Sequence, residues 1–432
     1  MFSKIKQRIL ADKSIGVLKG MLILLVGAGI ARIIGLMSIP ILTRIYSPED
    51  YGVLALYTSI VTVLAPFMTL RYVLALPLPN NGLLALGLRA LCLKLIFLAS
   101  IIFSIVLYLF GEPILVWLNM EQLVDWRWLI VLGASGVALY ELSTLWATRY
   151  KFYKKLARAQ FVQSLVLNSS QIILGLFSIK PLGMLIGHFA SQVAGVLSLT
   201  KTSQNNLNIS AKKLSWKKKL LIAKYYQGFV WFRLPSHVLM VFSIQAPVMM
   251  MVILFGTEST GQFSLAMLAL SLPISIMGSA MSKAYYAEIA SLGKNNIDII
   301  YAITLSVQKK LFYVGIPSAA IVYFISESLF GFLFGAEWAM AGKFASILAP
   351  FVLFQFTSSP LMEAINVLGK QYVYLILNIV RLIGLIMIFK LAGYIQLTDE
   401  KFVGVISIYL SVFYCFASVL VVLMIKNARS RG

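Results

Sequence analysis

The chain is a succession of long apolar runs, each of about 18 to 28 residues, separated by short charged or Pro- and Gly-containing stretches. A run of this length crosses the roughly 30 Å hydrocarbon layer of a bilayer as a helix. Apolar and polar residues do not alternate along the runs, which excludes an outer-membrane barrel. Because 60% of the 432 residues are hydrophobic and 12% are charged, a water-soluble core is excluded as well. The sequence therefore predicts an all-α polytopic membrane protein.

Clusters of charge, Pro and Gly bound twelve expected transmembrane helices. The first follows a basic amino terminus and continues too far to be a signal peptide, so we interpret it as an uncleaved span. The twelve spans are expected near residues 19–42, 51–76, 83–110, 127–148, 157–179, 182–200, 226–255, 260–283, 311–334, 343–366, 371–394 and 403–425.

The basic residues are distributed unequally between the two sides of this arrangement. About 25 of the 37 Lys and Arg residues fall in the amino terminus, the tail and the loops near 149–158, 201–224, 283–310 and 367–370. The opposite loops hold about five. Cytoplasmic loops carry the excess of positive charge in membrane proteins. Both termini are therefore predicted to be cytoplasmic, and the formal charge of +22 indicates topology and not nucleic-acid binding.

An internal repeat divides the chain at its midpoint. SPEDYGVLAL at the start of the second span matches GTESTGQFSL at the start of the eighth, which pairs Gly52 with Gly261, and LFGEP from Leu109 resembles LFGAE from Leu333. We expect an amino-terminal lobe over 1–205, a basic linker over 206–225 and a carboxyl-terminal lobe over 226–432. Six spans in each half give two lobes of the same orientation, which is a transporter's architecture. The linker is either a solvated connection or an interfacial helix on anionic lipid.

Several arginines are expected inside the membrane, where a charge at mid-depth costs about 2.5–3.5 kcal/mol. Arg32 and Arg381 lie near the middle of their spans, and Arg71 and Arg233 lie in the inner third of theirs beside prolines. We predict that these four side chains face a shared central cavity between two six-helix lobes. A surplus of fixed cations in a low-dielectric interior attracts an anionic substrate.

Two carboxylates are also expected in the membrane, Glu141 in the fourth span and Glu363 in the tenth. Each is either a charge partner of a neighbouring arginine or a proton carrier coupled to transport. The sequence has no glycine-rich phosphate loop, no HExxH and no nucleophile elbow, so no enzyme activity and no cofactor are expected. Cys92 and Cys415 lie in apolar runs, are interpreted as small core residues, and do not suggest a metal site.

The stretch IPILTRIYSPEDYGVLALYTSIVTVLAPFMTLRYVLALPLP, from Ile39 to Pro79, resembles the amino-terminal signature of Wzx-type oligosaccharide flippases, whose superfamily includes the multidrug MATE transporters. The resemblance implies a MATE-like carrier in the bacterial inner membrane. It would move undecaprenyl-diphosphate-linked oligosaccharide, such as an O-antigen or lipopolysaccharide repeat unit, to the periplasmic leaflet by alternating access. The resemblance assigns anion binding to Arg32 and Arg71, with Arg233 and Arg381 as counterparts.

One position departs from this family pattern, because Val73 follows Arg71 and Tyr72 where the family often has a glutamate. The lack of an adjacent carboxylate favours a free Arg71 that faces the cavity, unless a carboxylate such as Glu141 pairs with it from another span. The implied partners are membrane lipid and the polymerase and chain-length proteins of the same pathway.

Two other classes of function share parts of this pattern. A MATE-type cation-coupled drug exporter needs acidic groups for its cationic cargo, which the excess of buried arginine disfavours. A membrane polymerase or ligase of the pathway would be expected to show a sizeable periplasmic loop, and the longest outer loop expected here, near 111–126, is short.

Overall fold

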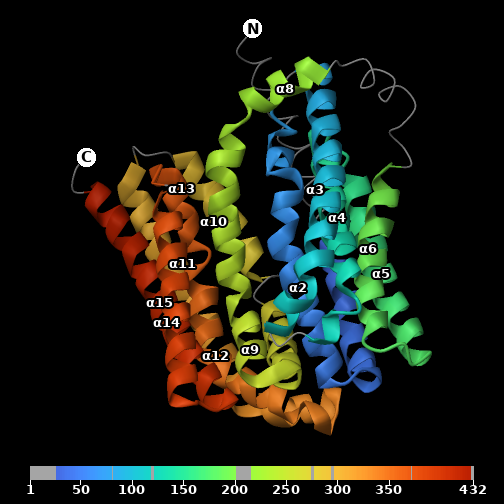
Figure 1. Cartoon of the computed structure of the whole chain (residues 1–432). Helices are drawn as coiled ribbons and strands as arrows, with labels where there is room; N and C mark the ends of the chain where they lie inside the picture. The colour runs from blue at the N-terminus through green and yellow to red at the C-terminus, as the bar shows by residue number, and fades with distance from the viewer. Residues whose placement is uncertain are drawn as a thin grey trace. The chain divides into compact units, whose positions relative to one another are not determined.

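The computed structural model describes residues 26–79, 81–117, 121–200, 216–273, 277–292, 296–370 and 372–429, and every regular element in these ranges is a helix (Figure 1). The chain separates into two compact units. One comprises the chain up to Tyr46 together with Tyr57–Val238, and the other comprises Ser47–Leu56 and Leu239–Gly432. The expectation of an all-α polytopic protein is confirmed.

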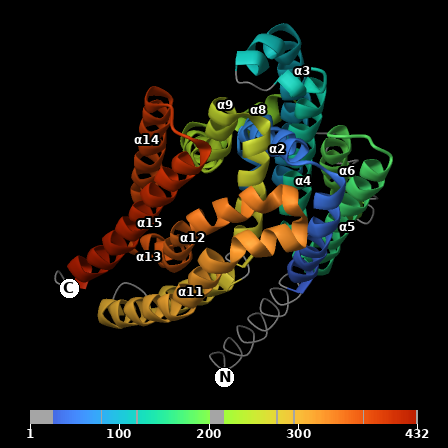
Figure 2. The ribbon, with the colours of Figure 1, turned by 90° about the horizontal axis from the view of Figure 1, so that it is seen from below.

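The first unit is built around four antiparallel helices. Helix α5 packs along α6, while α4 packs against both α6 and α3 (Figures 1 and 2). The elements of this part of the chain are Val26–Ile45, α2 (Pro48–Thr69), η1 (Tyr72–Ala75), α3 (Gly82–Trp117), η2 (Glu121–Leu123), α4 (Arg127–Arg149), α5 (Tyr153–Leu176), α6 (Leu182–Thr200), α8 (Trp216–Tyr225) and η3 (Phe229–Arg233).

The second unit has its core where α12 packs between α11 and α15, with α14 against α15 (Figure 2). Its elements are α9 (Leu234–Pro273), α10 (Ser279–Leu292), α11 (Ile297–Phe334), η6 (Ala336–Trp338), α12 (Ala339–Ser358), η7 (Leu361–Glu363), α13 (Ala364–Leu368), α14 (Tyr372–Ile395) and α15 (Asp399–Arg429).

Length and apolar composition identify ten membrane-spanning helices among the described residues. Two features account for the difference from the twelve expected. The stretch Phe229–Ser271 counts as one span, although Gly256 within α9 has φ 79° and ψ −175° and breaks the helical path. Helix α5 is 24 residues long but too polar to be counted.

Two glutamines of α5 have hydrogen-bond partners inside the first unit. The Gln163 Nε2 donates to Gln192 Oε1 on α6 at 2.9 Å, and the Gln171 Nε2 donates to the Met184 carbonyl at 3.1 Å. Buried polar groups are tolerated in a membrane when each finds such a partner. Helix α5 therefore takes the place of the fifth expected span, although its polar residues lower its mean hydropathy.

The two glycines matched by the repeat meet in the structure. A Cβ on Gly52 of α2 would lie 1.9 Å from the Thr257 carbonyl oxygen, and one on Gly261 of α9 would lie 1.7 Å from the Pro48 carbonyl oxygen. Both obstacles are backbone atoms, which cannot move aside like a flexible side chain. Only glycine permits this close crossing of α2 and α9 inside the second unit.

Three expectations about loops and cysteines were wrong. Helix α3 continues through Pro113 to Trp117, so much of the outer loop expected near 111–126 is helical. The loop expected over 283–310 is mostly the end of α10 and the start of α11. Cys92 is buried as expected, but Cys415 is exposed.

The predicted linker lies partly outside the described residues, because only 216–225 of its range 206–225 are described. These residues form α8, which packs against α3. The Tyr72 hydroxyl donates to the Ala223 carbonyl at 3.1 Å and attaches the end of α8 to the first unit. Leu221 and Tyr225 are exposed at 70% and 80%, which favours the interfacial interpretation over the solvated one.

Candidate functional site: the buried arginines

Arg71 occupies a strained turn where α2 ends. Leu70 and Arg71 have φ of 46° and 59°, in the left-handed region that costs a side-chain-bearing residue roughly 1–3 kcal/mol. The turn ends α2 at Thr69 and begins the 3-10 helix at Tyr72. It directs the arginine side chain toward α4 and not along the axis of α2.

The Arg71 side chain forms an ion pair with Glu141 of α4. Its Nη1 lies 2.9 Å from Oε1 and 3.2 Å from Oε2 of the carboxylate. The Arg71 side chain is 8% exposed and that of Glu141 is 28% exposed. The Arg71 Nε has no hydrogen-bond acceptor, so the guanidinium keeps unused donors. The expectation of a free Arg71 was wrong, because α4 supplies the carboxylate that residue 73 does not.

Arg233 lies on a segment next to this ion pair. The turn Tyr72–Ala75 contacts the π-helical stretch Phe229–Arg233. Arg233 itself is exposed. The first unit therefore brings two of the predicted cations onto adjoining segments, one of them buried.

The remaining predicted residues of the site lie elsewhere. Arg32 is half-buried in Val26–Ile45. Glu363 is half-buried in η7 and accepts a hydrogen bond from Asn366 Nδ2 at 2.9 Å. The prediction that four arginines face one cavity stays a prediction, because Arg381 belongs to the second unit and the other three belong to the first.

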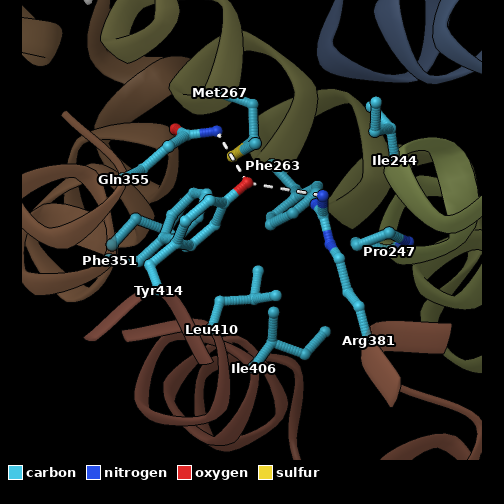
Figure 3. Close-up of a pocket in the computed structure, with 11 residues that line it drawn as sticks. Ile244, Pro247, Phe263, Met267, Phe351, Gln355, Arg381, Ile406, Leu410 and Tyr414 are labelled. Atoms are coloured by element: carbon cyan, nitrogen blue, oxygen red, sulfur yellow. Dashed lines mark hydrogen bonds between the residues drawn. The ribbon is translucent and has the colours of Figure 1, made fainter. Parts of the chain in front are cut away.

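Arg381 lines a cavity of about 130 Å³ within the second unit (Figure 3). The arginine is 8% exposed, and its Nη1 donates to the Tyr414 hydroxyl of α15 at 3.4 Å. The Gln355 Nε2 of α12 donates to the same hydroxyl at 3.4 Å. The other lining residues are mainly apolar: Ile244, Pro247, Phe263, Met267, Leu348, Phe351, Ile406 and Leu410.

Neighbouring side chains fix the position of Arg381 on α14. The Tyr409 hydroxyl of α15 donates to the Val380 carbonyl at 2.9 Å and lies 3.3 Å from the Arg381 carbonyl. Gly384 lets this ring approach, because a Cβ there would lie 2.1 Å from the Tyr409 hydroxyl. Sequence reasoning missed both tyrosines, since an uncharged aromatic in an apolar span resembles an interfacial anchor or core residue.

Metal-ligating side chains do not cluster in the part of the chain that the structure describes: no group of three or more His, Cys, Asp or Glu residues gathers there. The chemistry that the two arginine sites offer is charge stabilisation by hydrogen-bond donors. Such sites recognise anions.

The family profile described as polysaccharide biosynthesis protein matches residues 41–343. No curated protein matches the sequence closely enough to count as a relative. Among solved structures, an inward-facing multidrug resistance MATE family transporter of the MOP superfamily is similar, with a TM-score of 0.72, 13% identity and coverage of 92% of this chain and 96% of that one. The lipid II flippase MurJ in an inward closed conformation is similar with a TM-score of 0.71, 14% identity and coverage of 94% and 90%.

These likenesses establish the MATE-like fold expected from the sequence. The neighbours described are transporters and flippases and not enzymes. The family match spans well over half of the 432 residues. The chain is therefore a multi-pass membrane protein that belongs to the polysaccharide biosynthesis protein family.

Proposed function

We propose that the protein is a flippase for a lipid-linked oligosaccharide. Its cargo is an undecaprenyl-diphosphate-linked repeat unit, moved from the cytoplasmic to the periplasmic leaflet of the bacterial inner membrane by alternating access. The observation that carries the proposal is membership of a polysaccharide biosynthesis family on a fold shared with membrane carriers. One of the carriers with this fold is described as a lipid II flippase.

Arg71 is the first candidate for binding the diphosphate. It is buried, it keeps an unpaired Nε, and its carboxylate partner is partly exposed. A diphosphate presents more acceptor oxygens and more negative charge than one carboxylate, so it competes for the guanidinium. Arg233 and Arg32 add positive charge from the same unit. Direct contact of the diphosphate with Arg381 requires its cavity to widen, because about 130 Å³ cannot hold a sugar-linked diphosphate.

Fold similarity does not separate a flippase from a drug exporter, since the TM-scores for the MATE transporter and for MurJ are 0.72 and 0.71. The charges do separate them. Among the described residues, Arg71 and Arg381 are the arginines that are at least nine-tenths buried, and guanidinium groups attract anions. A carrier of cationic drugs requires the opposite arrangement.

Deletion of the gene tests the proposal directly. In a strain with no other flippase for the same cargo, the lipid-linked oligosaccharide is expected to accumulate on the cytoplasmic leaflet, and the wild-type gene restores surface glycan. Arg71→Met is expected to fail to restore it. Arg429→Met is the matched control, because Arg429 forms an exposed ion pair with Asp298. Normal surface glycan in the deletion strain refutes the proposed function.

A further inference from the structure

The guanidinium of Arg381 lies 5.8 Å from the centre of the Tyr414 ring, a cation–π contact, but it has no anionic partner among the described residues of the second unit. It carries five N–H donors, and its one hydrogen bond to the described protein is the 3.4 Å contact with Tyr414. Its Nε is buried without an acceptor. No carboxylate among the described residues lies within ion-pair distance of it. A buried charge in this condition is destabilising unless a counter-charge reaches it.

In the first unit, by contrast, the buried arginine has a carboxylate partner. Arg71 is neutralised by Glu141 at 2.9 Å. The helices α5 and α6, which hold the fifth and sixth places in the first half as α14 and α15 do in the second, are joined by the neutral pair Gln163 and Gln192. Among the described residues, Arg381 is thus a buried cation for which the second unit supplies no carboxylate partner.

The polar groups around the cavity are mostly donors. The Tyr414 hydroxyl oxygen accepts hydrogen bonds from both Gln355 and Arg381 (Figure 3). Both of its lone pairs are then used, which leaves its own hydrogen to donate. Arg381, which has unused guanidinium N–H groups, and Tyr414 both line this cavity. A set of donors with a net positive charge and few acceptors selects an anion over water or a cation.

Size and charge define which anion fits. A volume of about 130 Å³ equals roughly four water molecules at about 30 Å³ each, enough for one small ion with a few waters. One guanidinium balances one negative charge. The apolar walls, such as Phe263 and Leu410, penalise strongly hydrated divalent anions.

We propose that the Arg381 cavity binds one small monovalent inorganic anion, of which chloride is the physiological example, as a resident counter-ion of the second unit. The ion is held by Arg381 and Tyr414 and is not the transported cargo. The site is independent of the proposed function, and its presence is measurable without any transport assay.

Thermal unfolding of the full-length protein in detergent tests the site. The protein is exchanged into sodium gluconate, whose anion exceeds the cavity, and chloride is titrated in at constant ionic strength. A saturable rise of the unfolding midpoint by about 2 °C or more is expected, because a ligand that binds only the folded state stabilises it. Arg381→Met keeps the side-chain volume and is expected to abolish the rise. Lys390→Met, an exposed cation on the same helix, is expected to retain it.

Tyr414→Phe provides a second variant that keeps the ring and removes the donor. It is expected to weaken the apparent chloride affinity by about tenfold, the effect of one hydrogen bond to a charged group. Bromide scatters X-rays anomalously, so crystals grown with bromide are expected to show one anomalous difference peak beside Arg381. The proposal is overturned if wild-type protein responds equally to chloride and gluconate, or if Arg381→Met responds like wild type. It is also overturned if undecaprenyl diphosphate, and not chloride, produces the Arg381-dependent shift, which assigns the cavity to the cargo.

Discussion

The ion pair between Arg71 and Glu141 predicts an asymmetric response to mutation. Glu141→Gln leaves a guanidinium whose side chain is 8% exposed without its counter-charge. Removing one partner of a buried pair costs about 3–5 kcal/mol, and the retained amide hydrogen bond places this variant at the lower end of that range. Arg71→Met leaves a carboxylate that is 28% exposed and can be hydrated, so its cost is expected to be smaller, about 1–2 kcal/mol.

The double variant Arg71→Met/Glu141→Gln removes both charges and is expected to be no less stable than Glu141→Gln alone. The free energy of unfolding is measured by SDS titration in mixed micelles, and the four proteins form a double-mutant cycle. Lys390→Met on α14 controls for the loss of any cation. Equal stabilities of the two single variants, or a larger loss for Arg71→Met, refute the reasoning that burial of the arginine dominates.

Three further predictions concern packing, positioning and topology. Gly261→Ala brings a Cβ against the Pro48 carbonyl and is expected to destabilise the protein by about 1–3 kcal/mol, whereas Gly331→Ala, with open space at its Cβ, is expected to be neutral or stabilising in an unfolding titration. Tyr409→Phe is expected to cost about 1 kcal/mol for its lost hydrogen bond, and an unchanged unfolding free energy contradicts this. In a cysteine-free background, Glu112→Cys is expected to react with a membrane-impermeant maleimide on intact cells and Lys151→Cys only after permeabilisation; the reverse pattern overturns the predicted orientation.

The positions of the spans could be predicted because hydropathy indicates which segments lie in the hydrocarbon layer. Hydropathy alone places the ends of helices too early. Helix α3 runs to Trp117, past the Gly-Glu-Pro sequence that indicated a loop, because water satisfies polar groups once the helix leaves the hydrocarbon. Glu112 is exposed there and lies 3.9 Å from Arg127.

The neighbours of the buried charges could not be predicted in the same way. Hydropathy indicates which segments span the membrane but not the direction in which each side chain points around its helix. Arg71 meets Glu141 from a helix 70 positions further along the chain, and the turn that aims it depends on two left-handed residues that are not glycine. Tyr414 carries no charge, so nothing in its local sequence distinguishes it from lipid-facing aromatics.

Pairing Arg71 with a carboxylate has a consequence for the proposed transport cycle. A diphosphate that binds this arginine must displace Glu141, and the selectivity of the site follows from that competition. A neutral or monoanionic lipid gains too little to break an ion pair at 2.9 Å, whereas a diphosphate supplies more charge and can accept from the free Nε as well. One ion pair thereby makes the binding of an anionic cargo depend on the displacement of Glu141.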